Sequence, residues 1–238
     1  MNFNDFNTLS KAQANSYESG LRAYMIGVFN KMFMALGLTG AVSFILSTNE
    51  QLMNYMLRSS GLSILLFIAT FGIAMVFSFR LHKMQVSTAN NLFWAFAALT
   101  GVSFAPIFVV YTGSSIAMAF FSSAALFGGM SLIGYTTKKD LTSIGTFAFV
   151  GMIVVFVTFF LNSIFFHNPM LSLVLSAVMV FIFCGLTAYD VQKIKEFYNY
   201  APSNEILSKL AILGAFTLYL DFINLFTYLL RFLGERKD

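Results

Sequence analysis

A carboxylate side chain stands in the middle of a long apolar segment near the end of the chain. Residues 213–232 read LGAFTLYLDFINLFTYLLRF, and Asp221 has eleven uncharged residues before it, back to Lys209, and nine after it, up to Arg231. An ionised side chain at the centre of a bilayer costs roughly 2.5 to 3.5 kcal/mol on insertion scales, so such residues face the interior of a helix bundle and have a partner. Asp221 is therefore the first candidate for a functional site.

Other polar residues lie on the same helix face as Asp221. Steps of three and four residues from Asp221 reach Gly214, Thr217, Asn224 and Tyr228, whereas the rest of the segment consists mainly of Leu, Phe, Ile and Ala. Residues at this spacing form one stripe along an α-helix. A stripe that faced lipid would leave polar groups without hydrogen-bond partners. We therefore expect it to face inward, with Thr217, Asn224 and Tyr228 as candidate pore-lining residues.

The candidate partner is Asp190, in the sequence GLTAYDVQKIK at the end of the preceding apolar segment. Consecutive antiparallel helices are frequently neighbours, so the two aspartates can meet inside the bundle, with Thr187, one turn before Asp190, as a further pore-lining candidate. Spacing places Asp190 near the interface and Asp221 near the midplane. They meet only if the helix of Asp190 extends past that residue or the helix of Asp221 starts deeper.

Each aspartate also has a structural interpretation. Asp190 can be a solvated acid at a helix end beside Lys193, and Asp221 can be a hydrogen-bonded acid without a function. Two carboxyl groups close together in a medium of low dielectric constant, by contrast, cannot both ionise freely, and such a pair is predicted to act as a proton sensor.

A cation near the two acids would hold them ionised. Arg80, at the inner end of the second apolar segment, is the arginine placed to reach them by snorkelling. The alternative is that Arg80 only marks the end of its helix, together with Lys83.

The composition indicates the class of protein that holds these acids. Of 238 residues, 58% are hydrophobic and 10% charged, whereas soluble domains carry about 25% charged residues. The chain is therefore predicted to be a membrane protein whose main partner is the lipid bilayer. Its net charge of +4 is explained by basic cytoplasmic loops and does not indicate nucleic acid. Cys184 is predicted to be a small buried hydrophobe, and His82 and His167 are isolated, which argues against a histidine metal centre.

The lengths of the charge-free intervals predict an all-α membrane protein with seven transmembrane helices, because about 20 apolar residues cross the hydrocarbon core. The turns YTGSS (111–115) and FHNP (166–169) each divide a long interval into two helices. The connections are short, so we expect a single seven-helix transmembrane domain, residues 23–234, between a polar N-terminal tail, 1–22, and a short C-terminal tail, 235–238. The expected spans are residues 28–49, 61–80, 91–110, 115–135, 141–165, 170–190 and 207–231.

Three local features add to this expectation. Asp140, in KKDLTS, is placed to cap the fifth helix. Pro106 is expected to bend the third helix. The small residues of AALFGG, 124–129, are expected to lie at a close helix contact.

Lysine and arginine predict the orientation, because cytoplasmic loops carry the excess of basic residues. With the N-terminus in the cytoplasm, ten of the 14 basic residues lie inside, and Arg58, Arg231, Arg236 and Lys237 lie outside. A cytoplasmic N-terminus is therefore predicted, although the basic tail RFLGERKD would return to the inner side if the last segment were re-entrant. Compact loops without a recognisable targeting signal favour a bacterial inner membrane.

Four segments of the chain resemble the Bax inhibitor-1, or transmembrane Bax-inhibitor-motif, family. They are AALTGVSFAPIF, FGGMSLIGYTTKKDL, GLTAYDVQKIK and LYLDFINLFTYLLRFLG, and the last two are the specific ones. The resemblance extends from about Arg22 to Gly234. The departures are small: SFAP stands where a second serine is common, and GAFT stands where GALS usually precedes LYLD, with Thr217 keeping the hydroxyl group.

The resemblance implies a fold and an activity. The fold is one in which two groups of three helices enclose a central C-terminal helix, and the activity is a pH-sensitive calcium leak across a membrane. It implies that Asp190 and Asp221 form a hydrogen-bonded pair that controls the pore and binds calcium weakly, with Arg80 as a latch. Calcium is then the transported ion, no cofactor is expected, and the protein is not an enzyme.

Two other functions stay open on the sequence. Aspartates on two successive membrane helices also occur in intramembrane aspartyl proteases, where they act as general acid and base. Those enzymes carry Gly-x-Gly-Asp around the second aspartate and a Pro-Ala-Leu run, whereas this chain has LYLD and no such run. The other function is that of a non-conducting membrane regulator of cell death or stress, which would act through protein partners that the sequence does not identify.

Overall fold

The computed structural model describes the backbone of residues 3–237 and the side chains of residues 15–59, 61–62, 64–81 and 83–237, so the side chain of His82 lies outside the described residues. Within that range the regular structure is helical, apart from one isolated bridge between Tyr111 and Arg236. The elements in chain order are α1 (Phe3–Ser47), α2 (Glu50–Arg58), α3 (Ser60–Arg80), η1 (Leu81–Lys83), α4 (Val86–Phe104), α5 (Ile107–Val110), α6 (Gly113–Thr136), α7 (Thr142–Leu161), η2 (Asn162–Phe166), α8 (Pro169–Tyr200) and α9 (Asn204–Leu233).

In the described part of the chain, six helical segments are long and apolar enough to cross a membrane. They are Asn15–Ser47, Val86–Val110, Gly113–Thr136, Thr142–Phe166, Pro169–Tyr200 and Asn204–Leu233. The segment Ile64–Arg80 of α3 is a shorter apolar helix. An all-α membrane fold is thus confirmed, whereas the number of seven spans stays a prediction.

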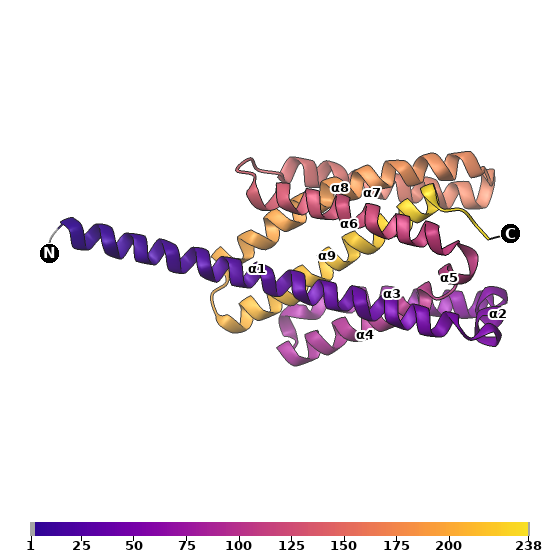
Figure 1. Ribbon diagram of the computed structural model, residues 1–238, viewed down its shortest axis with the longest axis horizontal. Helices are drawn as coiled ribbons and strands as arrows, with labels where there is room; N and C mark the ends of the chain where they lie inside the picture. The colour runs from indigo at the N-terminus through magenta and orange to yellow at the C-terminus, as the bar shows by residue number, and fades with distance from the viewer. Residues whose placement is uncertain (1–2, 238) are drawn as a thin grey trace.

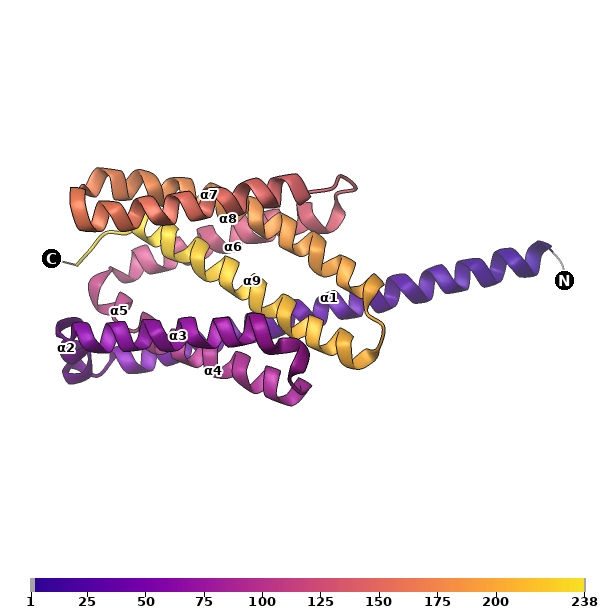
Figure 2. The same cartoon turned by 180° about the vertical axis from the view of Figure 1, so that it is seen from behind.

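The last helix, α9, runs through the middle of the molecule, between two groups of helices (Figures 1 and 2). In one group α4 packs against α1 and α3, and in the other α8 packs against α6 and α7. α9 itself contacts α8, α6, α1 and α4. Of the six candidate spans, α9 has the largest share of residues buried inside the protein, 44%, and the segment of α7 has the smallest, 17%. A polar group on α9 is therefore enclosed by other helices.

Two helices are longer than the sequence predicted. α1 begins at Phe3, so the expected polar tail is the start of a helix, and α8 continues to Tyr200, ten residues beyond the expected end. These helices extend beyond the predicted membrane spans because a charge does not end a helix where it can reach water. The end of α8 is set instead by Pro202, since a proline disfavours the helical conformation of the residue before it.

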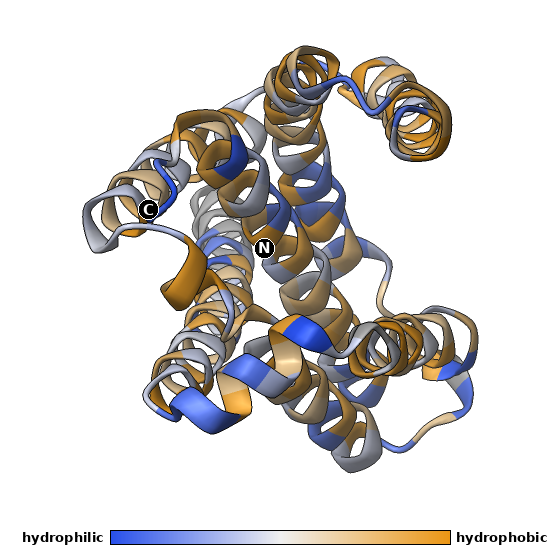
Figure 3. Cartoon of the chain, turned by 90° about the vertical axis from the view of Figure 1, so that its right-hand side faces the viewer, coloured by the Kyte–Doolittle hydropathy of each residue, from blue (hydrophilic) through white to orange (hydrophobic). Residues whose placement is uncertain are grey.

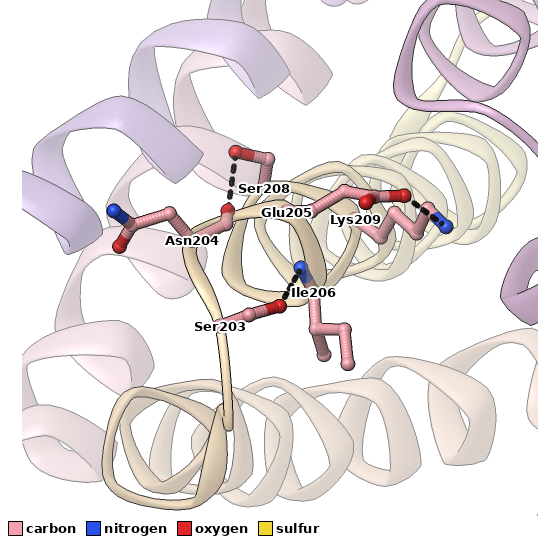
Figure 4. A network of polar contacts seen from close by, with 6 residues as sticks. All are labelled: Ser203, Asn204, Glu205, Ile206, Ser208 and Lys209. Atoms are coloured by element: carbon pink, nitrogen blue, oxygen red, sulfur yellow. Dashed lines mark hydrogen bonds and ion pairs between the residues drawn. The ribbon is translucent and has the colours of Figure 1, made fainter.

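The start of α9 is fixed by side chains, as Figure 4 shows. Ser203 Oγ accepts the backbone N–H of Ile206 at 3.3 Å, and Lys209 Nζ lies 2.8 Å from Glu205 Oε1. The Ser203 cap satisfies one of the free N–H groups of the first turn. Three residues, 201–203, separate the end of α8 from the start of α9, and the two helices are antiparallel neighbours.

The other local predictions have mixed outcomes. α4 ends at Phe104 and α5 begins at Ile107, so Pro106 interrupts the third apolar segment as expected. Asp140 accepts the backbone N–H of Thr142, the first residue of α7, at 2.8 Å, but the N-cap position itself is occupied by Leu141. Hydrogen bonds from the side chain and backbone of Thr142 lower the pKa of the Asp140 carboxyl group.

Close helix contacts occur at glycines other than the expected ones. A Cβ atom added at Gly134 of α6 would overlap the carbonyl oxygen of Ala188 on α8. Gly128 and Gly129 are exposed, and a Cβ atom there would meet nothing within 4 Å. The prediction of close packing at these two glycines was wrong, because their side of α6 points away from the neighbouring helices.

Large apolar side chains cover the outside of the bundle. Phe121, Phe147 and Phe181 are exposed by 69%, 80% and 79%. Seen along the bundle, apolar colours dominate the outer helices (Figure 3). An apolar surface of this extent is suited to contact with lipid rather than with water.

The two ends of the bundle differ. The N-terminus and the connections 81–85, 137–141 and 201–203 lie at one end, here called the N-terminal end, and α2, α5 and the C-terminus lie at the other, the C-terminal end (Figure 1). The tail is fixed there, since the Thr112 N–H donates to the Glu235 carbonyl at 3.1 Å and the Lys237 N–H donates to the Val110 carbonyl at 2.9 Å. α9 therefore passes from one end of the bundle to the other and is not re-entrant.

We predict that Gly134→Ala destabilises the protein, because the new methyl group must push α6 away from α8. Overpacking typically costs about 1–3 kcal/mol, and each kcal/mol lowers the melting temperature by about 2–4 °C at this size. The measurement is thermal unfolding of the purified protein in detergent. Gly128→Ala is the control, since it makes the same change on the same helix in open space. Equal melting temperatures for the two variants would contradict the close contact.

Candidate functional site

Asp221 lies in the interior of the bundle, near the middle of α9. Its side chain is 4% exposed. Thr217 and Asn224, which share its helix face, line the same cavity as Asp221. The polar face of α9 thus points into the protein.

Asp190 reaches Asp221 because α8 continues beyond it. With the helix end at Tyr200, Asp190 stands inside α8 and not at its end. The side chains of Asp190 and Asp221 line the same cavity. Two carboxyl groups form a hydrogen bond only when one of them carries a proton, because an ionised carboxylate has no donor.

The polar surroundings of Asp221 are sparse. Its Oδ2 atom is buried, and no amide, hydroxyl or ammonium donor of the described residues reaches it. A buried ionised oxygen without donors is costly. Asp190 of α8 is the other carboxyl group that lines the cavity beside Asp221.

The two acids line a cavity of about 560 Å³, here called the acidic cavity. It lies between α9, the second half of α8, the first half of α7 and Ser78 of α3. This volume holds many water molecules, each of which occupies about 30 Å³ in the liquid. Its polar lining residues include Thr217, Asn224 and Lys193.

Arg80, the predicted latch, does not enter the acidic cavity. Its side chain is exposed and lines a separate pocket with Phe79, Lys83 and Met84. Among the described side chains no ion pair joins it to either aspartate. The reason is helical geometry: residues two positions apart point about 200° apart, so Ser78 faces the cavity and Arg80 faces away. The latch stays a prediction, and this structure does not contain its contact.

The cation that does line the acidic cavity is Lys193. It lies one turn after Asp190 on α8 and is close enough to act on the charge of Asp190. Its Nζ atom donates to the Tyr189 hydroxyl at 3.1 Å and lies 5.3 Å from the centre of the Tyr189 ring. From the sequence, Lys193 was identified only as the neighbour of Asp190 in the alternative of a solvated helix end, and the spacing of three residues from Asp190 was the signal that it shares the face of this acid.

Two of the four pore-lining candidates lie elsewhere. Thr187 is fully buried, and its hydroxyl donates to the Phe183 carbonyl at 2.7 Å. Tyr228 stacks on Phe159 and Phe183, with ring centroids 6.0 and 5.8 Å away. Neither residue lines the acidic cavity, whereas Thr217 and Asn224 do.

A chain of buried hydroxyl groups holds the opposite side of α9. Tyr219 is fully buried, and its hydroxyl oxygen lies 2.7 Å from Thr39 Oγ1, which donates to the Ala97 carbonyl at 2.8 Å. Because Thr39 has only one proton to donate, the Tyr219 hydroxyl is the donor to Thr39. This chain joins α9 to α1 and α4. It fixes the rotation of α9 and so turns Asp221, two residues on, towards α8.

The described residues contain no group of three or more His, Cys, Asp and Glu side chains that could hold a metal ion. A cation in the acidic cavity would therefore have the two carboxyl groups as its acidic ligands. The remaining ligands would be the Thr217 hydroxyl, the Asn224 carbonyl oxygen and water. Hard cations such as calcium accept oxygen ligands of these kinds.

Comparisons with known proteins cover the whole site. The family model described as "Inhibitor of apoptosis-promoting Bax1" matches residues 21–238. A protein of Rickettsia prowazekii is 43% identical over 232 residues, which cover 97% of this chain and 98% of the relative. The inner membrane protein YbhL of Escherichia coli K12 is 38% identical over 221 residues, which cover 92% of this chain and 94% of YbhL. A Caulobacter vibrioides protein is 35% identical over 232 residues, 94% of this chain and 92% of its own.

The contact between the two acids predicts that their substitutions are not additive. Asp190→Asn and Asp221→Asn together are expected to change stability by an amount that differs from the sum of the single changes by about 0.5–3 kcal/mol, the range for residues in contact. Thermal unfolding in detergent measures this for the four chains of the cycle. Glu205→Gln combined with Asp221→Asn is the control, because Glu205 lies at the exposed start of α9 and its effect should add to within about 0.5 kcal/mol. Additivity in both cycles would contradict the contact.

Proposed function

The chain belongs to the Bax inhibitor-1 family, and on that premise we propose that this multi-pass integral membrane protein is a pH-sensitive calcium leak channel gated by Asp190 and Asp221. The observation that supports the proposal is that two carboxyl groups, one from α8 and one from α9, line one cavity of an apolar bundle. Ionisable side chains inside a membrane cost free energy and are typical of ion and proton pathways.

The two acids supply a response to pH. The charge of the pair is −1 when a proton is shared between them and −2 when both are ionised. The second ionisation is opposed by the charge already present and by the low dielectric constant of the interior. Small changes in pH on one side of the membrane therefore change the charge of the cavity, and this charge sets the balance between a closed and an open bundle.

The same oxygens supply a weak site for calcium. Two carboxyl groups with hydroxyl, amide and water oxygens form an incomplete coordination shell for an ion that takes six to eight ligands. A weak site is what conduction requires, since an ion that binds tightly does not leave. Moderate acid then favours opening, whereas full protonation of the pair also removes the calcium ligands.

Lys193 is the cation that we assign to the closed state. It lies in the acidic cavity and stabilises the ionised pair of aspartates, so its attraction to the pair is weakened when the pair is protonated. The latch that the family resemblance implies for Arg80 would require this side chain to leave the pocket it shares with Lys83. Arg80 therefore belongs to the proposal as a latch in a different conformation.

The location follows from relatives and charges. Because the similar Escherichia coli protein is named an inner membrane protein, we place this chain in the inner membrane of a bacterium. The N-terminal end of the bundle holds Lys83, Lys138 and Lys139 in its connections, and the C-terminal end holds Arg236 and Lys237 in the tail. Over the whole chain the basic residues favour the N-terminal end, which we place in the cytoplasm.

Calcium entry into liposomes that contain only the purified protein tests the function. Entry is expected to rise several-fold from about pH 8 to about pH 6 and to fall again in stronger acid, as the pair loses its charges. Asp221→Asn and Asp190→Asn are expected to flatten this profile to within about twofold, because one titrating group is lost.

The controls separate the competing functions. Glu205→Gln removes an acid from the surface of α9 and is expected to leave the pH profile unchanged. No calcium entry at any pH would favour a non-conducting regulator. Cleavage of a membrane peptide by the pure protein, lost in either aspartate variant, would favour an aspartyl protease. An Asp221→Asn profile identical to the native one would reject the gating pair.

Substitution of Lys193 tests the cation. Lys193→Gln is expected to raise calcium entry at about pH 8 by several-fold, because the ionised pair then loses its stabilising partner. Lys195→Gln is the matched control on α8, since Lys195 donates to the Tyr135 carbonyl and does not line the acidic cavity. Equal effects of the two lysine substitutions would contradict the role of Lys193. Arg80→Gln in the same assay shows whether the latch exists, by a rise of similar size.

A further inference from the structure

A second cavity follows the acidic cavity along the bundle. It has a volume of about 510 Å³ and lies between the first half of α3, the second half of α4 and α9. On α9 the acidic cavity is lined from Leu213 to Asn224, and the second cavity is lined from Leu220 to Asn224. On α3 the acidic cavity reaches Ser78, and the second cavity is lined by residues 62 to 74. The second cavity therefore lies closer to the C-terminal end, where α2 and α5 lie (Figure 2).

The second cavity offers oxygen atoms without charges. The hydroxyl groups of Thr70, Thr100 and Ser103 line it, and each donates to a carbonyl four residues earlier on its own helix, at 2.6, 2.9 and 3.1 Å. Because their protons are used in this way, the hydroxyl oxygens present lone pairs to the cavity. A hydrated cation that leaves the two carboxyl groups would meet neutral oxygen ligands here, from which it departs easily.

The two cavities share Leu220 and Asn224 as lining residues. Asn224 Nδ2 donates to the Leu220 carbonyl at 2.8 Å, which leaves its Oδ1 atom as the acceptor. Leu220 is half-buried and immediately precedes Asp221. The place where the cavities adjoin thus consists of an apolar side chain beside one amide, within one helical turn of the gating acid.

From this arrangement we infer that Leu220 is the permeation barrier between two water-filled halves of the ion route, and that Asn224 is the polar residue that an ion passes from one half to the other. The inference rests on the proposed function and adds the position of its barrier. An apolar constriction excludes ions by dewetting, since the water column breaks where no polar group holds it. Asp221 in one half and the barrier one residue away are then carried by the same helix, α9.

The test combines a flux measurement with a labelling measurement that does not depend on flux. In a Cys184→Ser background, which removes the single cysteine, Thr217→Cys places a thiol in the acidic cavity and Ser103→Cys places one in the second cavity. With Leu220 in place, a small charged methanethiosulfonate reagent is expected to modify each thiol from one face of the proteoliposome only, and from opposite faces for the two positions. Modification of both thiols from the same face would overturn the inference.

Truncation of Leu220 is expected to open the barrier. Leu220→Ala should let the reagent reach each thiol from both faces and should raise calcium entry at about pH 7 by about tenfold, because the apolar constriction is lost. Leu213→Ala makes the same change on α9 within the acidic cavity alone and should leave the sidedness of labelling as it is. If Leu220→Ala fails to fold, as judged by gel filtration, Leu220→Val carries the same test with a smaller increase.

The outcomes separate the inference from the proposed function. Unchanged sidedness and unchanged flux in Leu220→Ala and Leu220→Val would overturn the barrier, even if the native protein conducts calcium. Two-sided labelling in these variants, together with the absence of calcium entry in every chain, would support two cavities divided at Leu220 while rejecting calcium conduction.

Discussion

The burial of a carboxyl group in the centre of an apolar bundle is the constraint on which the rest of this structure depends. Asp221 is 4% exposed, and its Oδ2 atom is reached by no hydroxyl, amide or ammonium donor of the described residues. A side chain in that position is tolerated only if another group takes up its hydrogen-bonding capacity. Asp190 lines the same cavity, and in the function that we propose the two acids share a proton or a cation. The proposed response to both protons and cations follows from this arrangement.

The helices that enclose α9 fix the direction in which Asp221 points. A helix surrounded on several sides can rotate only if its neighbours move, because interiors are packed at crystal-like density. The chain from Tyr219 through Thr39 to the Ala97 carbonyl adds directional bonds to this packing. It anchors one face of α9 to α1 and α4, while the face of Asp221 meets α8. The exposed apolar side chains, by contrast, only need to be compatible with contact to lipid, so their identities say little about the site.

The sequence was sufficient for the family, since a charge inside an apolar segment is rare and its neighbours form a specific motif; membership in the family is confirmed, whereas the role of the two acids stays a prediction. It was insufficient for the cation. The choice between Arg80 and Lys193 depends on where a helix ends and how it is rotated, and tertiary packing decides both. The spacing of the polar residues likewise predicted which face of α9 points inward, but not how many residues of that face line the cavity. Thr217 lines the cavity, whereas Tyr228 stacks on aromatic rings.

The extension of α8 past Asp190 has a mechanical consequence. Its last turns carry Tyr198, whose ring lies 5.5 Å from that of Tyr17 and 5.7 Å from that of Tyr24 on the protruding part of α1. α1 has 45 residues, so it is about 68 Å long, more than the roughly 40–45 Å of a whole bilayer. Asp190 is thus carried on a long helix whose last turns contact α1 through aromatic rings. These contacts couple the position of Asp190 to the position of α1, with no loop between them.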